Sequence, residues 1–191
     1  MRIFSLVLTL LLLAGCAPTS QVVNLAPTAP TAGPGDQVAG AGRLALEVVD
    51  GRNDSAVGTL IGSEGKRAPI TAAHDVPYSL QLAVADALSK RGFKPTVWSD
   101  DAQPRLLVEI EKLNLTVDDS LPRHLDTEVV LKATAWHHGQ RYTSSAQSSI
   151  SDRMATRPSA ETSATYLNKG LSQALDKLLA PKLMQFLGTG P

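Results

Sequence analysis

Three charged side chains lie close together after an apolar, alternating segment: Asp50, Arg52 and Asp54. Two carboxylates and a guanidinium in one loop could hold a cation or an anionic ligand. The alternative is structural, because Asp side chains in loops commonly accept backbone N–H groups and an arginine can pair with a nearby carboxylate. Both interpretations stay open, and the ligand-binding one extends over the loop 50–62.

The other patterns that could do chemistry are incomplete. The segment GSEGK at 62–66 resembles a phosphate loop, but Leu60 and Arg67 hold the places of its first glycine and its final hydroxyl. His137 and His138 are adjacent, and adjacent side chains on a strand point to opposite faces, so they would not meet at one metal ion. No serine stands in Gly-x-Ser-x-Gly. We therefore expect no enzyme activity, no cofactor and no metal site.

The single cysteine, Cys16, follows an apolar run at 3–13. This run has the length of a signal-peptide core and is too short for a membrane-spanning helix, which needs roughly 20 residues. The sequence Leu13-Ala14-Gly15-Cys16 resembles the bacterial lipobox, which implies diacylglyceryl transfer to the thiol and then cleavage before it. One cysteine makes no internal disulfide, and lipidation at Cys16 accounts for its presence.

The segment after the cysteine predicts both location and organisation. Ala17, by resemblance to the sorting rule of Gram-negative lipoproteins, indicates the outer membrane. Residues 17–42 are rich in Ala, Pro, Thr and Gly, and Pro27, Pro30 and Pro34 block helix formation. We expect a tether that reaches ~80 Å when extended. The predicted organisation is a signal peptide at 1–15, a lipidated cysteine and tether at 16–42, and one globular domain at 43–191.

The remaining sequence alternates between strand and helix patterns. Asp75 and Ser159 are expected N-caps of two helices, the second of which should stop at Pro181. A phase shift near Glu111 predicts a β-bulge. Period-2 patterns predict strands at 44–49, 106–117 and 127–135, and we also expect a short extended segment at 93–98 and a Ser-rich strand at 142–150. The order β-α-β-β-β-β-α predicts an α+β fold, a two-layer sandwich with two helices on one face of a mostly antiparallel sheet. The Ser-rich strand 142–150 is expected at a sheet edge, where its backbone is open to a partner.

Composition excludes one broad class of partner. The chain has 18 basic and 18 acidic residues, so no net field attracts nucleic acid. Hydrophobic residues make up 43% of the chain, which is typical of a protein with a packed core.

Several segments, taken in order, are similar to a known family. They are Cys16, the Pro-rich segment, VVDGR at 48–52 with GTLIG at 58–62, Ala87-Leu88 with Arg91-Gly92-Phe93, and the Leu-rich terminal helix. Together they resemble the YajG family of uncharacterised bacterial lipoproteins over nearly the whole mature chain. The resemblance implies an envelope lipoprotein with a small α/β module, and it supplies no catalytic residues to carry over.

These observations favour a non-catalytic binding or scaffolding module, anchored by lipid at the periplasmic face of the outer membrane. Its expected partners are the membrane, through the anchor, and an envelope protein, and the strand 142–150 could also pair two copies of the chain. The alternative is a carrier or sensor of a small envelope ligand, such as a cell-wall fragment, a glycan or a lipid, bound over the loop 50–62.

Overall fold

The computed structural model describes residues 18–31, 33, 36–62, 65–120 and 122–189, which form eight strands and three helices. The strands are β1 (Gln21–Val23), β2 (Arg43–Asp50), β3 (Ala56–Ile61), β4 (Arg67–Ala72), β5 (Lys94–Val97), β6 (Arg105–Asp118), β7 (Arg123–His137) and β8 (Gln140–Met154). The helices are α2 (Val76–Ser89), α3 (Ala160–Leu178) and α4 (Pro181–Thr189).

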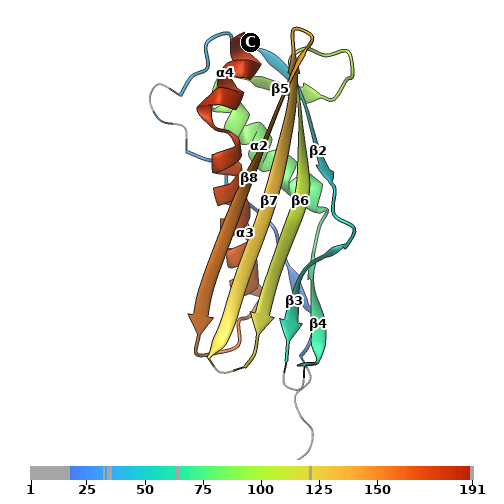
Figure 1. Cartoon of the computed structure of the whole chain (residues 1–191), viewed down its shortest axis with the longest axis vertical. Helices are drawn as coiled ribbons and strands as arrows, with labels where there is room; N and C mark the ends of the chain where they lie inside the picture. Colours follow the sequence, from blue (N-terminus) through green and yellow to red (C-terminus); the bar gives the residue numbers. More distant parts are fainter. Residues whose placement is uncertain (1–17, 32, 34–35, 63–64, 121, 190–191) are drawn as a thin grey trace, which may run out of the picture.

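One long strand, β6, organises the sheet (Figure 1). On one side it pairs antiparallel with β7, which pairs in turn with β8. On the other side it has two partners: β2 runs parallel to Arg105–Ile110, and β3 runs parallel to Leu115–Asp118. The predicted bulge is confirmed, because the β6–β7 register shifts between Ile110 and Lys112. A bulge increases local twist, so the sheet curls where β6 changes partner.

The predicted α+β class is confirmed, but the sheet is mixed and not mostly antiparallel. Four of the pairings among the described strands are parallel: β1–β4, β2–β5, β2–β6 and β3–β6. The predicted order also lacked the antiparallel hairpin β3–β4, whose first strand lies in residues interpreted as the loop 50–62. Gly58 hides this strand from a pattern search, yet the fold requires glycine there: a Cβ would lie 2.3 Å from the Leu115 carbonyl oxygen.

Within the described residues, three helices cover the sheet, where two were predicted. The predicted N-caps are confirmed, since the Asp75 carboxylate accepts from Tyr78 N and the Ser159 hydroxyl accepts from Thr162 N. Pro181 ends α3 as expected and then begins α4 at its first position, where its missing N–H costs nothing. Helix α3 packs on β6, β7 and β8, α2 packs on β2 and β5, and α4 packs on β7 and β8.

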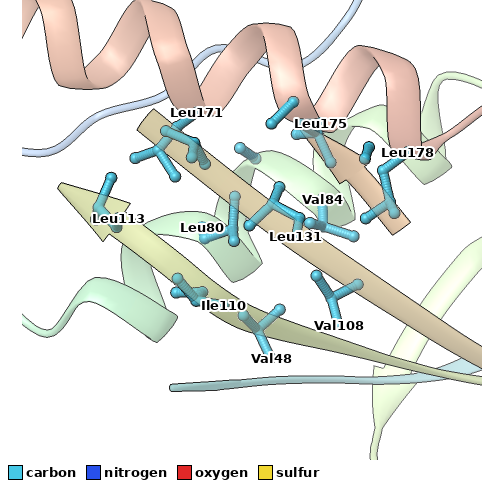
Figure 2. Close-up of a cluster of buried hydrophobic side chains, with 14 of the residues drawn as sticks. Val48, Leu80, Val84, Val108, Ile110, Leu113, Leu131, Leu171, Leu175 and Leu178 are labelled. Atoms are coloured by element: carbon cyan, nitrogen blue, oxygen red, sulfur yellow. The ribbon is translucent and has the colours of Figure 1, made fainter. Parts of the chain in front are cut away.

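The core fills the space between these helices and the sheet. Figure 2 shows Leu171, Leu175 and Leu178 of α3 directed toward Leu131 of β7, with residues of α2, β2 and β6 completing the cluster. Leu131 and Leu175 are 0% exposed. Along β7, buried positions alternate with half-buried or exposed ones, and the side of the sheet away from α3 carries mostly polar side chains.

The free tether predicted for 16–42 is corrected by the structure over the described part of that segment. Gln21–Val23 form β1, which pairs with β4, and Val23 and Leu25 are buried. Further along, Ala26 N donates to Asn168 Oδ1 at 2.8 Å and Thr28 N donates to Ser172 Oγ at 2.9 Å. The proline-rich composition prevents a helix, as predicted, but it does not prevent an extended strap from crossing α3. Tertiary contacts that lie more than 140 residues away hold it in place.

Candidate functional site

The charged loop after β2 is closed on itself. The Arg52 guanidinium donates to both carboxylate oxygens of Asp50, at 2.8 Å from Nε and 2.7 Å from Nη2. Its Nη1 donates to the carbonyl oxygens of Ala56 at 2.9 Å and Leu113 at 3.3 Å. Asp54 accepts the backbone N–H of Ala56 at 2.9 Å. Four of the five guanidinium N–H groups are thus hydrogen-bonded within the protein. This arrangement favours the structural interpretation of the loop over the ligand-binding one.

This arginine fills the gap at which β6 changes partner. β2 ends its pairing at Ile110 and β3 begins at Leu115, so the Leu113 carbonyl lies between the two ladders and Arg52 satisfies it. The Arg52 side chain is only 7% exposed, and its hydrogen bonds hold the pKa of Asp50 below the ordinary value. Asp50, Arg52 and Asp54 therefore brace β2, β3 and β6 through these hydrogen bonds.

The two adjacent histidines differ from their prediction. β7 ends at His137, and His138 lies in the turn with φ of 50°, so the two rings stack at 4.1 Å instead of facing opposite sides. His137 Nδ1 lies 2.9 Å from the Phe186 carbonyl oxygen. In the part of the chain that the structure describes, no three His, Cys, Asp or Glu side chains are close enough to hold a metal ion.

Strand β8 offers a long edge. Among the described strands it pairs with β7 alone, through 15 consecutive residue pairs without a register shift. The Gln147 carbonyl accepts from Lys177 Nζ at 2.8 Å and so points away from β7. Antiparallel pairing alternates, so the backbones of Ser145 and Ser149 point the same way. The predicted edge position of this Ser-rich strand is confirmed, and at ~3.4 Å per residue the edge is about 50 Å long.

The middle of this edge lacks most of the features that usually protect one, and the charges of β8, on Arg141, Asp152 and Arg153, lie near its ends. Natural edge strands carry proline, lysine or a bulge, or are short. β8 has no proline and no lysine between Gln140 and Met154, and its register is continuous. The other edges of the sheet are short, with four residues in β5 and three in β1. Helix α3 meets the edge through Lys177, at the Gln147 carbonyl.

An aromatic and basic cluster, which the sequence patterns did not reveal, lies at the end of the sheet where β6 begins and β7 ends. The Arg105 guanidinium lies 4.8 Å from the ring centroid of Trp136 and 5.8 Å from that of Trp98, and the two indole rings meet edge to face at 5.9 Å. Val97 beside them is 89% exposed. Trp and Arg are the residue types concentrated in protein interfaces. Trp98 and Trp136 are 38 positions apart in the sequence, so no local pattern indicates the cluster. The pairing of Arg105 with Trp136 in the β6–β7 register brings the side chains together.

An apolar groove lies where the N-terminal segment passes α2. It has a volume of about 570 Å³, and one of its walls includes Leu25 and Pro27 of the N-terminal segment. On its other wall stand Tyr78 and Leu82, one helical turn apart and 61% and 56% exposed. Nothing in the sequence pattern signalled this groove, because one of its walls was interpreted as a tether.

Comparison with known proteins identifies the family. A family model described as an uncharacterized lipoprotein matches residues 27–187. The chain belongs to this lipoprotein family. The resemblance to YajG-like lipoproteins is thereby confirmed, and membership indicates membrane anchoring. No match was found among proteins of curated function.

A solved structure shares the fold of this lipoprotein. A crystal structure of protein XCC0632 from Xanthomonas campestris, assigned to family DUF330, is 14% identical with a TM-score of 0.54, and the match covers 88% of this chain and 96% of that one. A second crystal structure, of an uncharacterized protein, is 9% identical with a TM-score of 0.46, covering 85% and 97% of the two chains. The first likeness supports the fold and carries no residue roles.

The lipidation site itself, Cys16, lies outside the described residues, and its acylation remains a prediction. Over the described ranges, none of the helices combines the length and the apolar character that crossing a bilayer requires. The outer membrane as the location also remains a prediction, which depends on Ala17.

Proposed function

We propose that this lipoprotein is a non-catalytic binding module, anchored through Cys16 at the periplasmic face of the outer membrane, that captures an extended segment of an envelope protein along β8. The observation that carries the proposal is the 15-residue edge of β8, which pairs on one side only among the described strands. A strand added there would gain main-chain hydrogen bonds over much of that length.

The side chains of the edge suit a polar, sequence-tolerant partner. Ser145, Gln147 and Ser149 are exposed, and none of them carries a charge that would repel a second strand. In such pairing the backbone provides affinity and alternate side chains provide specificity. Lys177, which donates to the Gln147 carbonyl, has to yield one hydrogen bond when a partner binds.

Two proline substitutions test the edge. Ser145→Pro with Gln147→Pro removes two N–H groups that point away from β7, so the β7 ladder and the helices should persist while capture is lost. The matched control is Ser145→Ala with Gln147→Ala, which removes the side chains and keeps both N–H groups. A photo-crosslinker at Ser149, in the full-length lipidated protein in its own envelope, reports capture, and mass spectrometry identifies the crosslinked protein.

We expect the alanine variant to retain the crosslinked product and the proline variant to lose it. Circular dichroism verifies that both variants keep their helix content. A folded proline variant that crosslinks as well as the alanine variant would refute capture by strand addition. A crosslink to a second copy of this chain would instead identify the captured strand as its own β8.

A second candidate is the carrier of a small envelope ligand, favoured by the groove at Tyr78 and Leu82. Its volume of about 570 Å³ falls within the range of small-molecule sites, and two large apolar side chains remain exposed on its wall. A lipid or glycan that binds there should raise the melting temperature of the wild type and not that of Leu82→Asp. No shift with any envelope lipid or glycan at saturating concentration would remove this candidate.

A further inference from the structure

We infer that one end of the domain, formed by the ends of β3, β4, β6, β7 and β8 at Ile61, Arg67, Asp118, His124 and Arg153, lies directly on the bilayer, so that β8 rises from the membrane surface. This inference rests on the proposed function in one respect, the lipid anchor at Cys16. It does not depend on what β8 captures.

The start of the described chain fixes the point at which the anchor leaves the domain. Pro18 contacts Gly62 in the β3–β4 turn, so closely that a Cβ on Gly62 would lie 2.8 Å from Pro18 Cδ. Three residues later β1 begins, and Gln21 is held by Pro158 O at 2.9 Å and by the Ser163 hydroxyl at 2.7 Å. The chain at Pro18 is therefore set against this end of the domain.

The remaining length is very short. Cys16 precedes Pro18 by two residues, which span at most about 7 Å of extended chain. A lipidated Cys16 lies at the membrane surface, because its acyl chains are in the bilayer. Pro18, and with it the neighbouring Gly62, must then lie close to that surface, since the link to Cys16 reaches only about 7 Å, whereas a tether over residues 17–42 would have allowed ~80 Å.

The sheet register places other segments at the same end. Ile61 pairs with both Arg67 and Asp118, Asp118 pairs with His124, and His124 pairs with Arg153. These residues form one row across the ends of β4, β3, β6, β7 and β8. Figure 1 shows the same end as the lower tips of the strands, with β5 and α4 at the opposite end. The Trp98–Trp136 cluster lies at that opposite end, away from the membrane.

Charge makes only a small contribution to this orientation. Residues 61–67, 118–124 and 152–158 contain five basic and four acidic side chains. Two of the basic ones, Arg123 and Arg157, pair with Asp119. Each uncompensated cation near an anionic surface contributes about 1 kcal/mol, so a net charge of about one cannot orient the domain by itself. The short link to the anchor holds this end of the domain at the surface. Because a covalent link is not screened by salt, the orientation should persist in high salt.

The consequence concerns which partners are within reach. The edge of β8 starts at Gln140, at the far end, and reaches Met154 beside the membrane. A captured strand must come within about 50 Å of the bilayer, the length of this edge. The partner is thus an extended segment of a protein that is itself located at or near the outer membrane.

Fluorescence quenching tests the orientation. The full-length chain, expressed with its signal segment and purified from membranes, is reconstituted in phosphatidylethanolamine and phosphatidylglycerol vesicles that carry a headgroup nitroxide quencher. A single dye is attached at Thr156→Cys, at the membrane end, or at Gln140→Cys, at the far end; both positions are exposed. We expect several-fold stronger quenching at Thr156, unchanged in about 0.5 M salt, where screening is nearly complete beyond a few ångströms.

A spacer variant provides the matched control. Inserting about 20 Gly and Ser residues after Ala17 restores a flexible link with a reach of roughly 25 Å, so quenching at Thr156 should fall toward that at Gln140. Equal quenching at the two positions in the chain without the insertion would overturn the inference.

Failure of the anchor is separable from failure of the orientation. The mass of the peptide that starts at Cys16 and flotation with vesicles report acylation. An unmodified Cys16 without flotation overturns the anchor of the proposed function together with this inference. An acylated, floating protein with equal quenching overturns the inference alone and leaves capture by β8 standing.

Discussion

Two polar regions of this lipoprotein differ in how many of their hydrogen-bonding groups are paired within the fold. The loop with Asp50, Arg52 and Asp54 is the most chemically suggestive stretch of the sequence, yet its hydrogen-bonding groups bond mainly to one another and to Ala56 and Leu113. The strand β8 has few charges and no motif, yet one side of its backbone pairs with none of the other described strands. Availability for binding depends on which groups remain unpaired after folding, and a count of charged residues does not measure that.

The largest expected effect is on the loop. Arg52→Ala removes four hydrogen bonds and leaves the Leu113 carbonyl unsatisfied between two ladders, so we expect a loss of ~3 kcal/mol in the free energy of unfolding. Urea denaturation measures it. The matched control is Arg67→Ala, an exposed arginine on β4, which should change stability by less than about 0.5 kcal/mol. Similar values for both would mean that Arg52 is not a brace.

Proline at neighbouring positions of β8 tests which side of the strand is paired. Ser144→Pro removes an N–H that points to β7 and should cost about 3 kcal/mol, whereas Ser145→Pro removes one that points to the open edge and should cost about 1 kcal/mol or less. Urea denaturation of the two variants gives the difference directly. Equal losses would contradict the register on which the open edge depends.

The pH dependence of stability reports the Asp50–Arg52 pair. Arg52 lowers the pKa of Asp50 in the folded state, so the pair stabilises the protein above the unfolded pKa of about 3.9 and loses that contribution as pH falls through the lower folded value. Asp50→Asn should be less stable than the wild type by about 1 kcal/mol at pH 7 and should lose less stability below pH ~4. Parallel stability curves for the two proteins from pH 7 to pH 3 would count against this assignment.

The smallest change in stability is expected for Lys177, beside the open edge of β8. Lys177→Met removes the donor that covers the Gln147 carbonyl, and because the lysine is exposed the stability should change by only a few tenths of a kcal/mol. The edge should then be more available, and crosslinking from Ser149 should increase. Lys169→Met, on the same helix and also exposed, is the control. No increase for Lys177→Met relative to Lys169→Met would show that the lysine does not guard the edge.

Local sequence signals predicted the elements whose stability is local. The caps Asp75 and Ser159, the stop at Pro181 and the bulge near Glu111 depend on a few neighbouring residues, and all are confirmed. The long alternating strands also satisfy the period-2 pattern over enough residues to be recognised. The strand β3 was missed because Gly58 interrupts its pattern, and the need for that glycine comes from Leu115 on another strand.

Sequence patterns were enough to predict the α+β class, the family, the edge position of the strand at 142–150 and a lipid anchor at Cys16. Three features emerged only from tertiary contacts: the Asp50 loop is a brace, the predicted tether is a strand and a strap, and Arg105, Trp98 and Trp136 form one cluster. These depend on contacts between residues far apart in the chain, such as Ala26 with Asn168 and Arg52 with Leu113. Periodicity and propensity describe neighbours along the chain, and the pairing of distant polar groups is settled only when the whole core closes.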